Sequence, residues 1–179
     1  MNLDIEFLKY PVGRFKLPVA LTPEAISDAI STIKAFPTSL FATVSPLSLS
    51  QLDTPYRPGG WTVRQLVHHC ADSHMNAFIR FKLALTEDNP TIKPYDEVAW
   101  ATLSDAELPI ESALSILKAI HFKWGILLES MSMEDFRRTY FHPEKQRNQA
   151  LDEITLMYAW HALHHLAHVQ HLILRDFDR

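Results

Sequence analysis

The sequence predicts an all-α fold, a four-helix bundle with a metal site between helices. Apolar residues recur at three- and four-residue steps in four long segments, and only 4 of the 179 residues are glycine. Short to medium connections join these segments, which is typical of a helical bundle. The length suits one compact core, and no repeat or linker divides the chain. We therefore expect a single domain over residues 1–179.

The first predicted helix is amphipathic and contains two prolines. Pro23 suits its first turn, where a missing N–H costs little. Pro37 lies in its interior, so we expect a kink or an interruption in the later turns. The apolar face of this helix comprises Ile26, Ile30, Ile33, Phe36, Leu40 and Val44.

The second predicted helix follows a loop of prolines and glycines that ends at Gly60. Thr62 and Gln65 have the spacing of a capping box, in which each residue satisfies a backbone N–H of the other. This signature predicts a helix that starts here and runs to about Glu87. A proline-containing connection then extends to about Leu108.

Two further helices complete the predicted bundle. Pro109 is expected at the first position of the third helix, which runs to about Met131. A short helical turn is expected between residues 132 and 138, and a loop at residues 141–144. The last helix is predicted from Leu151 to about Phe177.

Charge and cysteine content exclude several classes of protein. The net charge of −4 argues against a nucleic-acid-binding protein, because phosphate contacts need an excess of cations. The single cysteine, Cys70, excludes a disulfide framework and a cysteine-rich zinc site, and it suits a reducing cytoplasm. No apolar stretch approaches the ~20 residues of a membrane span. We therefore expect a cytoplasmic protein with no nucleic-acid or membrane partner.

Histidines are concentrated in the last predicted helix. Neutral imidazole is the commonest protein ligand of zinc, nickel and copper. Histidines four residues apart on a helix point their rings in the same direction. Four of them form one stripe at steps i, i+3, i+4 and i+7: His161, His164, His165 and His168. Pairs from this stripe predict half of a metal site.

The second predicted helix can supply a further ligand, from His68 or from His69. His69 shares a polar stripe with Gln65 and Asp72, whereas His68 lies further round the helix with Arg64. The register favours His69 modestly and leaves His68 open. Three imidazoles would leave one coordination position for water or substrate, as in catalytic zinc sites.

Two carboxylates are weak catalytic candidates. Asp72, one turn from His69, can accept the imidazole N–H that faces away from a metal, or it can be an ordinary surface residue. Glu153, two turns before His161, can act as a proton shuttle, or it can simply suit the positive end of its helix. No residue pair in the sequence identifies the catalytic residue.

The other reactive or aromatic residues are expected to be structural. Cys70 falls on an apolar helix face, so we expect a buried and inert thiol. His121 and His142 have no partner at metal-ligand spacing. Each tryptophan lies in or beside an apolar stripe and is expected in the core: Trp61, Trp100, Trp124 and Trp160.

Seven short motifs are distributed along nearly the whole chain: Tyr10–Phe15, Leu52–Arg57, Gly59–Gln65, His68–Asn76, Arg80–Glu87, Lys93–Glu97 and Trp160–His168. Together they resemble the DinB-like four-helix metalloprotein superfamily, and within it the YfiT-like branch. The resemblance implies one divalent metal per chain, zinc or else nickel, and a homodimer. It also implies that His69, His161 and His165 bind the metal, with His164 and His168 beside the site.

The same resemblance implies an enzyme that acts on a small molecule. Members of this branch are regarded as metal-dependent hydrolases, in which the ion activates water. Relatives in the superfamily are zinc-dependent transferases that join a low-molecular-weight thiol such as bacillithiol to an electrophile. We expect a hydrolase. The alternatives are a thiol S-transferase and a non-catalytic metal-binding bundle. A di-iron carboxylate site is set aside, because the Glu-x-x-His motifs it needs are missing.

Overall fold

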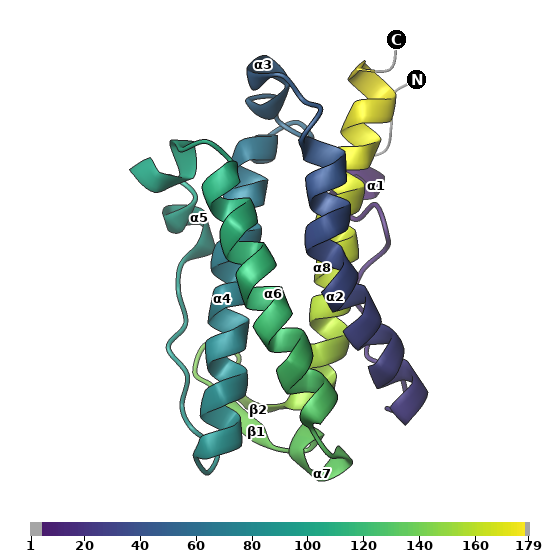
Figure 1. The fold of residues 1–179 in the computed structure, drawn as a ribbon, viewed down its shortest axis with the longest axis vertical. Coiled ribbons are helices and arrows are strands. Elements are labelled where there is room, and N and C mark those ends of the chain that lie inside the picture. Colours follow the sequence, from purple (N-terminus) through teal and green to yellow (C-terminus); the bar gives the residue numbers. More distant parts are fainter. Residues whose placement is uncertain (1–4, 178–179) are drawn as a thin grey trace.

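Four long helices form the body of the protein (Figure 1), and the four-helix prediction is confirmed. They are α2 (Pro23–Val44), α4 (Val63–Thr86), α6 (Glu111–Ser130) and α8 (Leu151–Leu172). The computed structural model describes residues 5–177. Residues 1–4 and 178–179, which the single-domain prediction includes, lie outside the described residues. Among the described residues no helix is both long and apolar enough to cross a membrane.

The long helices are not arranged in chain order around the bundle. The strongest packing joins α2 to α8 and to α6, and joins α4 to α6 and to α8. The resulting ring order is α2, α6, α4, α8, so the consecutive long helices α2 and α4 lie diagonally opposite each other. In a simple up-and-down bundle, consecutive helices are neighbours. The order seen here places α4 beside α8, the two helices that carry most of the histidines.

Two apolar clusters fill the bundle, one towards each end. The first cluster includes Leu66 and Leu117, and the second includes Phe81 and Trp124. Each long helix contributes to both clusters and passes from one to the other near its middle. The buried polar residues His74 and His121 lie at this level, between the two clusters along α4 and α6. A polar layer therefore crosses the otherwise apolar core.

Short helices and turns lie at the ends and along one side of the bundle. Most were expected as connections, and α7 matches the predicted helical turn after residue 132. They are α1 (Ile5–Lys9), α3 (Leu49–Leu52), α5 (Glu97–Trp100), the 3₁₀ turn η1 (Ser104–Glu107), α7 (Met133–Phe136) and the π-helical turn η2 (Ile173–Phe177). The last long helix was predicted to run to about Phe177. The α-helix α8 ends at Leu172, and the π-helical turn η2 continues the helical segment to Phe177.

A small antiparallel hairpin stands where the sequence predicts a loop at residues 141–144. Strand β1 (Thr139–His142) pairs with β2 (Arg147–Ala150) in a register that sets Thr139 opposite Ala150. Side chains alternate along β1, so Tyr140 and His142 are buried. Gln146 adopts a positive φ of 51° in the turn. Each strand has only four residues, so the two-residue periodicity of its side chains is too brief to be recognised in the sequence.

Two expectations for proline need correction. Of the kink or interruption expected at Pro37, the interruption does not occur, because α2 continues to Val44. Pro109 does not occupy the first helical position of α6, because Ile110 is the residue that precedes the helix. By contrast, the capping box of α4 is confirmed: Thr62 and Gln65 exchange the two expected hydrogen bonds.

The cap of α4 gives a first test. In Thr62→Ala the N–H of Gln65 loses the acceptor that lies 3.1 Å away, so the free energy of unfolding should fall by about 1 kcal/mol. Urea denaturation monitored by circular dichroism measures the change. Thr62→Ser keeps the hydroxyl and should remain close to wild type. Equal midpoints for the alanine variant and wild type would show that the cap does not hold this helix.

Candidate metal centre

Three histidines from two neighbouring helices converge on one point. His69 is on α4, and His161 and His165 lie one turn apart on α8. One ring nitrogen from each lies within 4.8 Å of the other two. The Nε2 atoms of His161 and His165 are 3.1 Å apart. The structure thus brings together the three residues that the family resemblance implies as ligands.

His68 points elsewhere. Its Nε2 lies 3.1 Å from the carbonyl oxygen of Leu108, in the segment before α6. Since it is directed towards this segment, His68 is not part of the cluster. The geometry therefore places His69, and not His68, in the three-histidine cluster.

The donor set fits a divalent cation. Two imidazole nitrogens that bind the same tetrahedral zinc lie about 3.4 Å apart, given Zn–N bonds of about 2.0–2.1 Å. The observed spacing between His161 and His165 is close to this value. Ligand imidazoles must also be neutral. Burial, reinforced by neighbouring histidines, lowers the pKa of His69 to about 4 and that of His161 and His165 well below its ordinary value.

A chain of hydrogen-bonded rings runs from this cluster through the core. His161 Nδ1 lies 3.1 Å from Nε2 of His74. His74 Nδ1 lies 2.7 Å from Nε2 of His121, and His121 Nδ1 lies 2.6 Å from the carbonyl oxygen of Ile33. The four residues come from α8, α4, α6 and α2. Every long helix therefore contributes one group to a line that ends at the candidate metal site.

The cluster opens into a pocket of ≈ 590 Å³ between the bundle and the loops around it. Trp61 lies over His69 with ring centroids 4.5 Å apart, and Trp160 stacks on His164 at 4.6 Å. Both tryptophans are half-buried and line the pocket, although Trp61 also packs against the first apolar cluster. Trp100 is half-buried beside Tyr95, so the prediction of a core position needs correction for Trp100 and Trp160. Trp124, which is fully buried, is the tryptophan that occupies the core as expected.

Arg57 lines the pocket without a carboxylate partner. Among the described residues no carboxylate lies within ion-pair distance of it, and its buried Nε has no hydrogen-bond acceptor. Its guanidinium lies 5.4 Å from the ring centroid of Tyr56. The other cationic lining residue, Lys9, is 3.8 Å from Glu6. Arg57 is thus a charged group whose strongest type of partner is missing.

Glu97, at the start of α5, is the carboxylate that lines the same pocket. Burial first, and then the negative charge of Asp96, raise the pKa of its carboxyl group. A raised pKa brings a carboxylate closer to the working range of a general acid or base. Its place in the chain, 64 residues before His161, gives no hint of this proximity.

His164 and His168 share the pocket but not the three-histidine cluster. Their Nε2 atoms are 3.1 Å apart. Burial first, and in part the positive charge of Arg57, lower the pKa of His164 to about 4 and that of His168 to about 3. Both therefore enter the pocket as neutral hydrogen-bonding groups. His171 stacks on Phe7 at 5.1 Å, away from the cluster.

Neither carboxylate named from the sequence has the contact expected of it. Asp72 forms no hydrogen bond with His69 among the described residues, and burial first, then the charge of Asp105, raises its pKa. Glu153 forms an ion pair with Arg147 of β2. This pair ties α8 to the hairpin, two turns from His161, so the proposed proton shuttle is not supported. Cys70 is fully buried as expected, and burial raises the pKa of its thiol.

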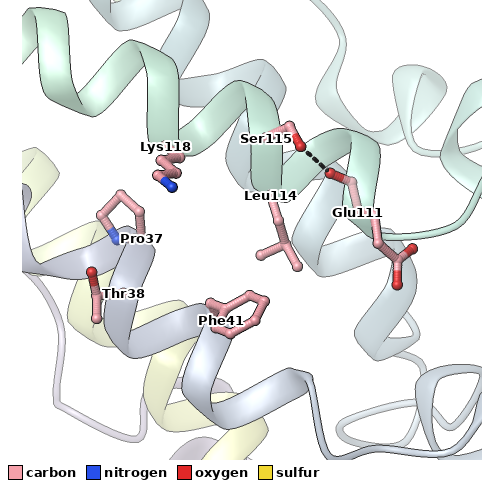
Figure 2. A pocket seen from close by; sticks show the side chains of 7 residues that line it. All are labelled: Pro37, Thr38, Phe41, Glu111, Leu114, Ser115 and Lys118. Carbon is pink, nitrogen blue, oxygen red and sulfur yellow. Dashed lines mark hydrogen bonds between the residues drawn. The ribbon is translucent and has the colours of Figure 1, made fainter.

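A second hollow, between α2 and α6, contains none of the clustered histidines (Figure 2). It lies across the helix ring from the contact of α4 with α8. Three apolar and four polar residues line it: Pro37, Phe41, Leu114, Thr38, Glu111, Ser115 and Lys118. It offers no group of metal ligands, so the candidate site is the pocket above the three histidines.

Sequence reasoning missed four residues that now belong to the site or its support. His121 was expected to have no partner, and its contact with His74 was missed because the two residues are 47 positions apart in the chain. Arg57 and Glu97 lie in loops, where no periodicity indicates which way a side chain points. Both are inside motifs that carry the family resemblance, and this was the available signal.

Comparison with known protein families identifies the same region. A profile described as the DinB superfamily matches residues 33–169. These limits include the three clustered histidines as well as His74 and His121.

Close relatives occur in bacilli. A protein of Bacillus cereus (strain 03BB102), named "Putative metal-dependent hydrolase", is 50% identical over 165 residues, which cover 92% of this chain and 95% of the relative. A protein of Bacillus thuringiensis subsp. konkukian with the same description shows the same identity and coverage.

A solved structure has the same fold. It is YfiT from Bacillus subtilis, described as "a probable metal-dependent hydrolase with an unusual four-helix bundle topology". The sequences are 42% identical, the TM-score is 0.91, and the match covers 94% of this chain and 97% of that one.

Proposed function

This chain belongs to the DinB superfamily, and we propose that it is a hydrolase that holds one divalent ion on His69, His161 and His165. The observation that carries the proposal is the convergence of three neutral imidazoles at the base of an open pocket. The relatives from Bacillus and the YfiT structure, which are all described as metal-dependent hydrolases, support it. Zinc is the proposed metal, with nickel as the second candidate, because both accept imidazole ligands.

The residues around the ion have different roles in the proposed hydrolysis. An ion held by His69, His161 and His165 would act as a Lewis acid and would lower the pKa of a bound water molecule to about 7. Glu97 accepts a proton from the attacking water and returns it to the leaving group. Trp61 and Trp160 flank the base of the pocket and restrict the access of other water molecules.

Arg57 indicates the class of substrate. The protein as a whole carries a charge of −4, but the pocket is lined by two cations and one carboxylate, before any metal charge is added. The Arg57 guanidinium donates through Nη1 to the carbonyl oxygen of Pro58 but has no carboxylate partner among the described residues, and its fork of donors matches the planar oxygens of a carboxylate, or those of a phosphate. We propose a small substrate that carries such an anionic group on the side of the pocket away from the scissile bond.

The metal ligands are tested by replacement. His69→Ala, His161→Ala and His165→Ala should each lose most of the zinc that wild-type protein binds, because two imidazoles leave the ion too weakly held. Elemental analysis after dialysis against zinc measures the stoichiometry. His68→Ala is the matched control, since it removes the adjacent and equally buried histidine, and should keep one zinc per chain. Stoichiometric zinc in all three ligand variants would refute the site.

The role of Glu97 is tested by removing its charge alone. Glu97→Gln should lower kcat/KM for p-nitrophenyl acetate and for N-acetyl amino acids by about 10²–10⁴-fold, because the proton acceptor is lost. Zinc content should be unchanged. Glu111→Gln, on the α2–α6 hollow, is the control and should match wild type.

Assays of the wild-type protein with these esters and amides, and with bacillithiol and an epoxide, separate the reaction classes. Wild-type protein that conjugates bacillithiol to an epoxide but leaves every ester and amide intact would be a thiol S-transferase. Wild-type protein that binds one zinc per chain but shows neither activity would be a non-catalytic metal-binding bundle.

The anion partner of Arg57 is tested by binding. Succinate and inorganic phosphate should quench the fluorescence of the pocket tryptophans in metal-free protein. Arg57→Gln should weaken this binding by about tenfold or more, because charge-assisted hydrogen bonds are lost. Arg64, whose guanidinium is already held by Asp53 at 2.7 Å, provides the control in Arg64→Gln. An equal loss in both variants would show that only general charge matters.

A further inference from the structure

We infer that Pro37, His121 and His74 form a positioning chain that holds His161 in the one tautomer able to bind the metal through Nε2. The inference rests on the proposed metal site and adds to it Pro37 and His121, from the two long helices that carry no ligand, and His74 from α4. It begins at a proline that sequence analysis treated as a helix defect.

Pro37 frees a backbone acceptor inside α2. In a helix the N–H of each residue bonds to the carbonyl oxygen four residues earlier. The residue four positions after Ile33 is Pro37, which has no N–H. The carbonyl of Ile33 therefore lacks its helical donor although it lies in an unbroken helix. A buried carbonyl without a donor is costly, so another group must approach it.

His121 of α6 provides that donor. Its Nδ1 lies 2.6 Å from the Ile33 carbonyl oxygen. His121 and Pro37 line the same side of the α2–α6 contact, where they share a hollow. Figure 2 shows Pro37 on the face of α2 that looks towards α6. A carbonyl can only accept, so the hydrogen of His121 must be on Nδ1.

Each ring then determines the tautomer of the next. A neutral imidazole has one donor and one acceptor. With its hydrogen on Nδ1, His121 accepts at Nε2 from Nδ1–H of His74, at 2.7 Å. His74 then accepts at Nε2 from Nδ1–H of His161, at 3.1 Å. His161 is left with a free lone pair on Nε2, the atom that faces His165 and the cluster.

The surroundings of the chain keep its rings neutral and in place. His74 and His121 are buried, and Phe36 packs against both rings. Trp124 and Tyr158 meet His74 edge to face. Neither histidine has a carboxylate partner among the described residues. At neutral pH an imidazole is already mostly uncharged, and this apolar cage disfavours the charged form further.

His165 provides an internal contrast. Its Nδ1 is buried and has no hydrogen-bond partner within residues 5–177. Its Nε2 lies 3.1 Å from the Nε2 lone pair of His161, so in the metal-free protein the hydrogen of His165 is held on Nε2 and must leave that atom before His165 can bind a metal there. The two ligands of α8 therefore differ: one is prepared for the metal by the core, and the other adopts its binding form only when the metal is bound.

A purely structural role is the competing interpretation, in which the chain only cross-links four helices. The two roles differ in what they change. A cross-link affects stability, whereas a positioning chain affects the tautomer of His161 and the metal affinity even when stability is preserved. Experiments that measure both quantities distinguish them.

The direct test uses His121→Phe, which keeps an aromatic ring but cannot donate or accept. In metal-free wild type, the ¹⁵N spectrum should show His161 as the pure Nδ1–H tautomer. In the variant His161 should become a mixture of tautomers, and the zinc dissociation constant, measured against a competing chelator, should rise about 10–100-fold.

Pro37→Ala is the second variant, because His121→Phe can fail to fold. It restores the N–H that competes with His121 for the Ile33 carbonyl. The melting temperature should stay level or rise, since an interior proline is removed from a helix, while the zinc dissociation constant should rise several-fold. Pro46→Ala, just beyond the end of α2, is the control and should leave zinc affinity unchanged.

Two results would overturn the inference. One is a His161 that keeps the pure Nδ1–H tautomer in both variants. The other is a zinc dissociation constant within twofold of wild type in both. Failure of the proposed metal site is a separate outcome: it would appear as wild-type protein that binds no zinc, while the metal-free spectra would still report on the chain.

Discussion

The hydrogen-bonded line from the Ile33 carbonyl through His121 and His74 to His161 is the constraint on which the rest of the structure depends. It visits α2, α6, α4 and α8 in turn. This sequence of helices is also the order in which they pack around the bundle. A bundle whose helices followed chain order would set α2 beside α4 and could not place these groups in the same succession. The uncommon helix order and the polar layer are therefore consistent with each other.

A polar layer is expensive in an apolar core unless each group is satisfied. Here each link of the line supplies one donor and one acceptor, and both ends are accounted for. One end is the carbonyl that Pro37 leaves free, and the other is a nitrogen that points towards the candidate metal position. Apolar clusters on both sides exclude water from the line. The protein thus uses its core to prepare a ligand, and the pocket residues Arg57 and Glu97 add charge at the open side.

Much of the fold could be predicted from the sequence because it depends on local patterns. The periodicity of apolar residues, the capping box at Thr62 and the four-residue spacing of His161 and His165 all act within a few turns of one helix. The hairpin at residues 139–150 was missed because its strands are four residues long. At Pro37 the local rule predicts a kink or an interruption, and α2 is not interrupted there because His121 of α6 approaches the Ile33 carbonyl that lacks its helical donor.

The site could be predicted only in part, because it depends on contacts between residues far apart in the chain. Contacts such as His74 with His161 join residues 87 positions apart, and no local pattern indicates which faces of α4 and α8 meet. The choice of His69 over His68 came from the family resemblance, and the geometry now provides its reason in the contact of His68 with Leu108. Arg57 and Glu97 depend on loop conformations, which carry the weakest sequence signals.

Anomalous scattering at the zinc edge, from crystals of the zinc-loaded protein, would test the central claim most directly. We predict one ion bound by Nε2 of His69, His161 and His165, with Nδ1 of His161 still hydrogen-bonded to His74. An ion bound instead by His164 and His168, or a His161 that binds through Nδ1 and has left His74, would contradict this account.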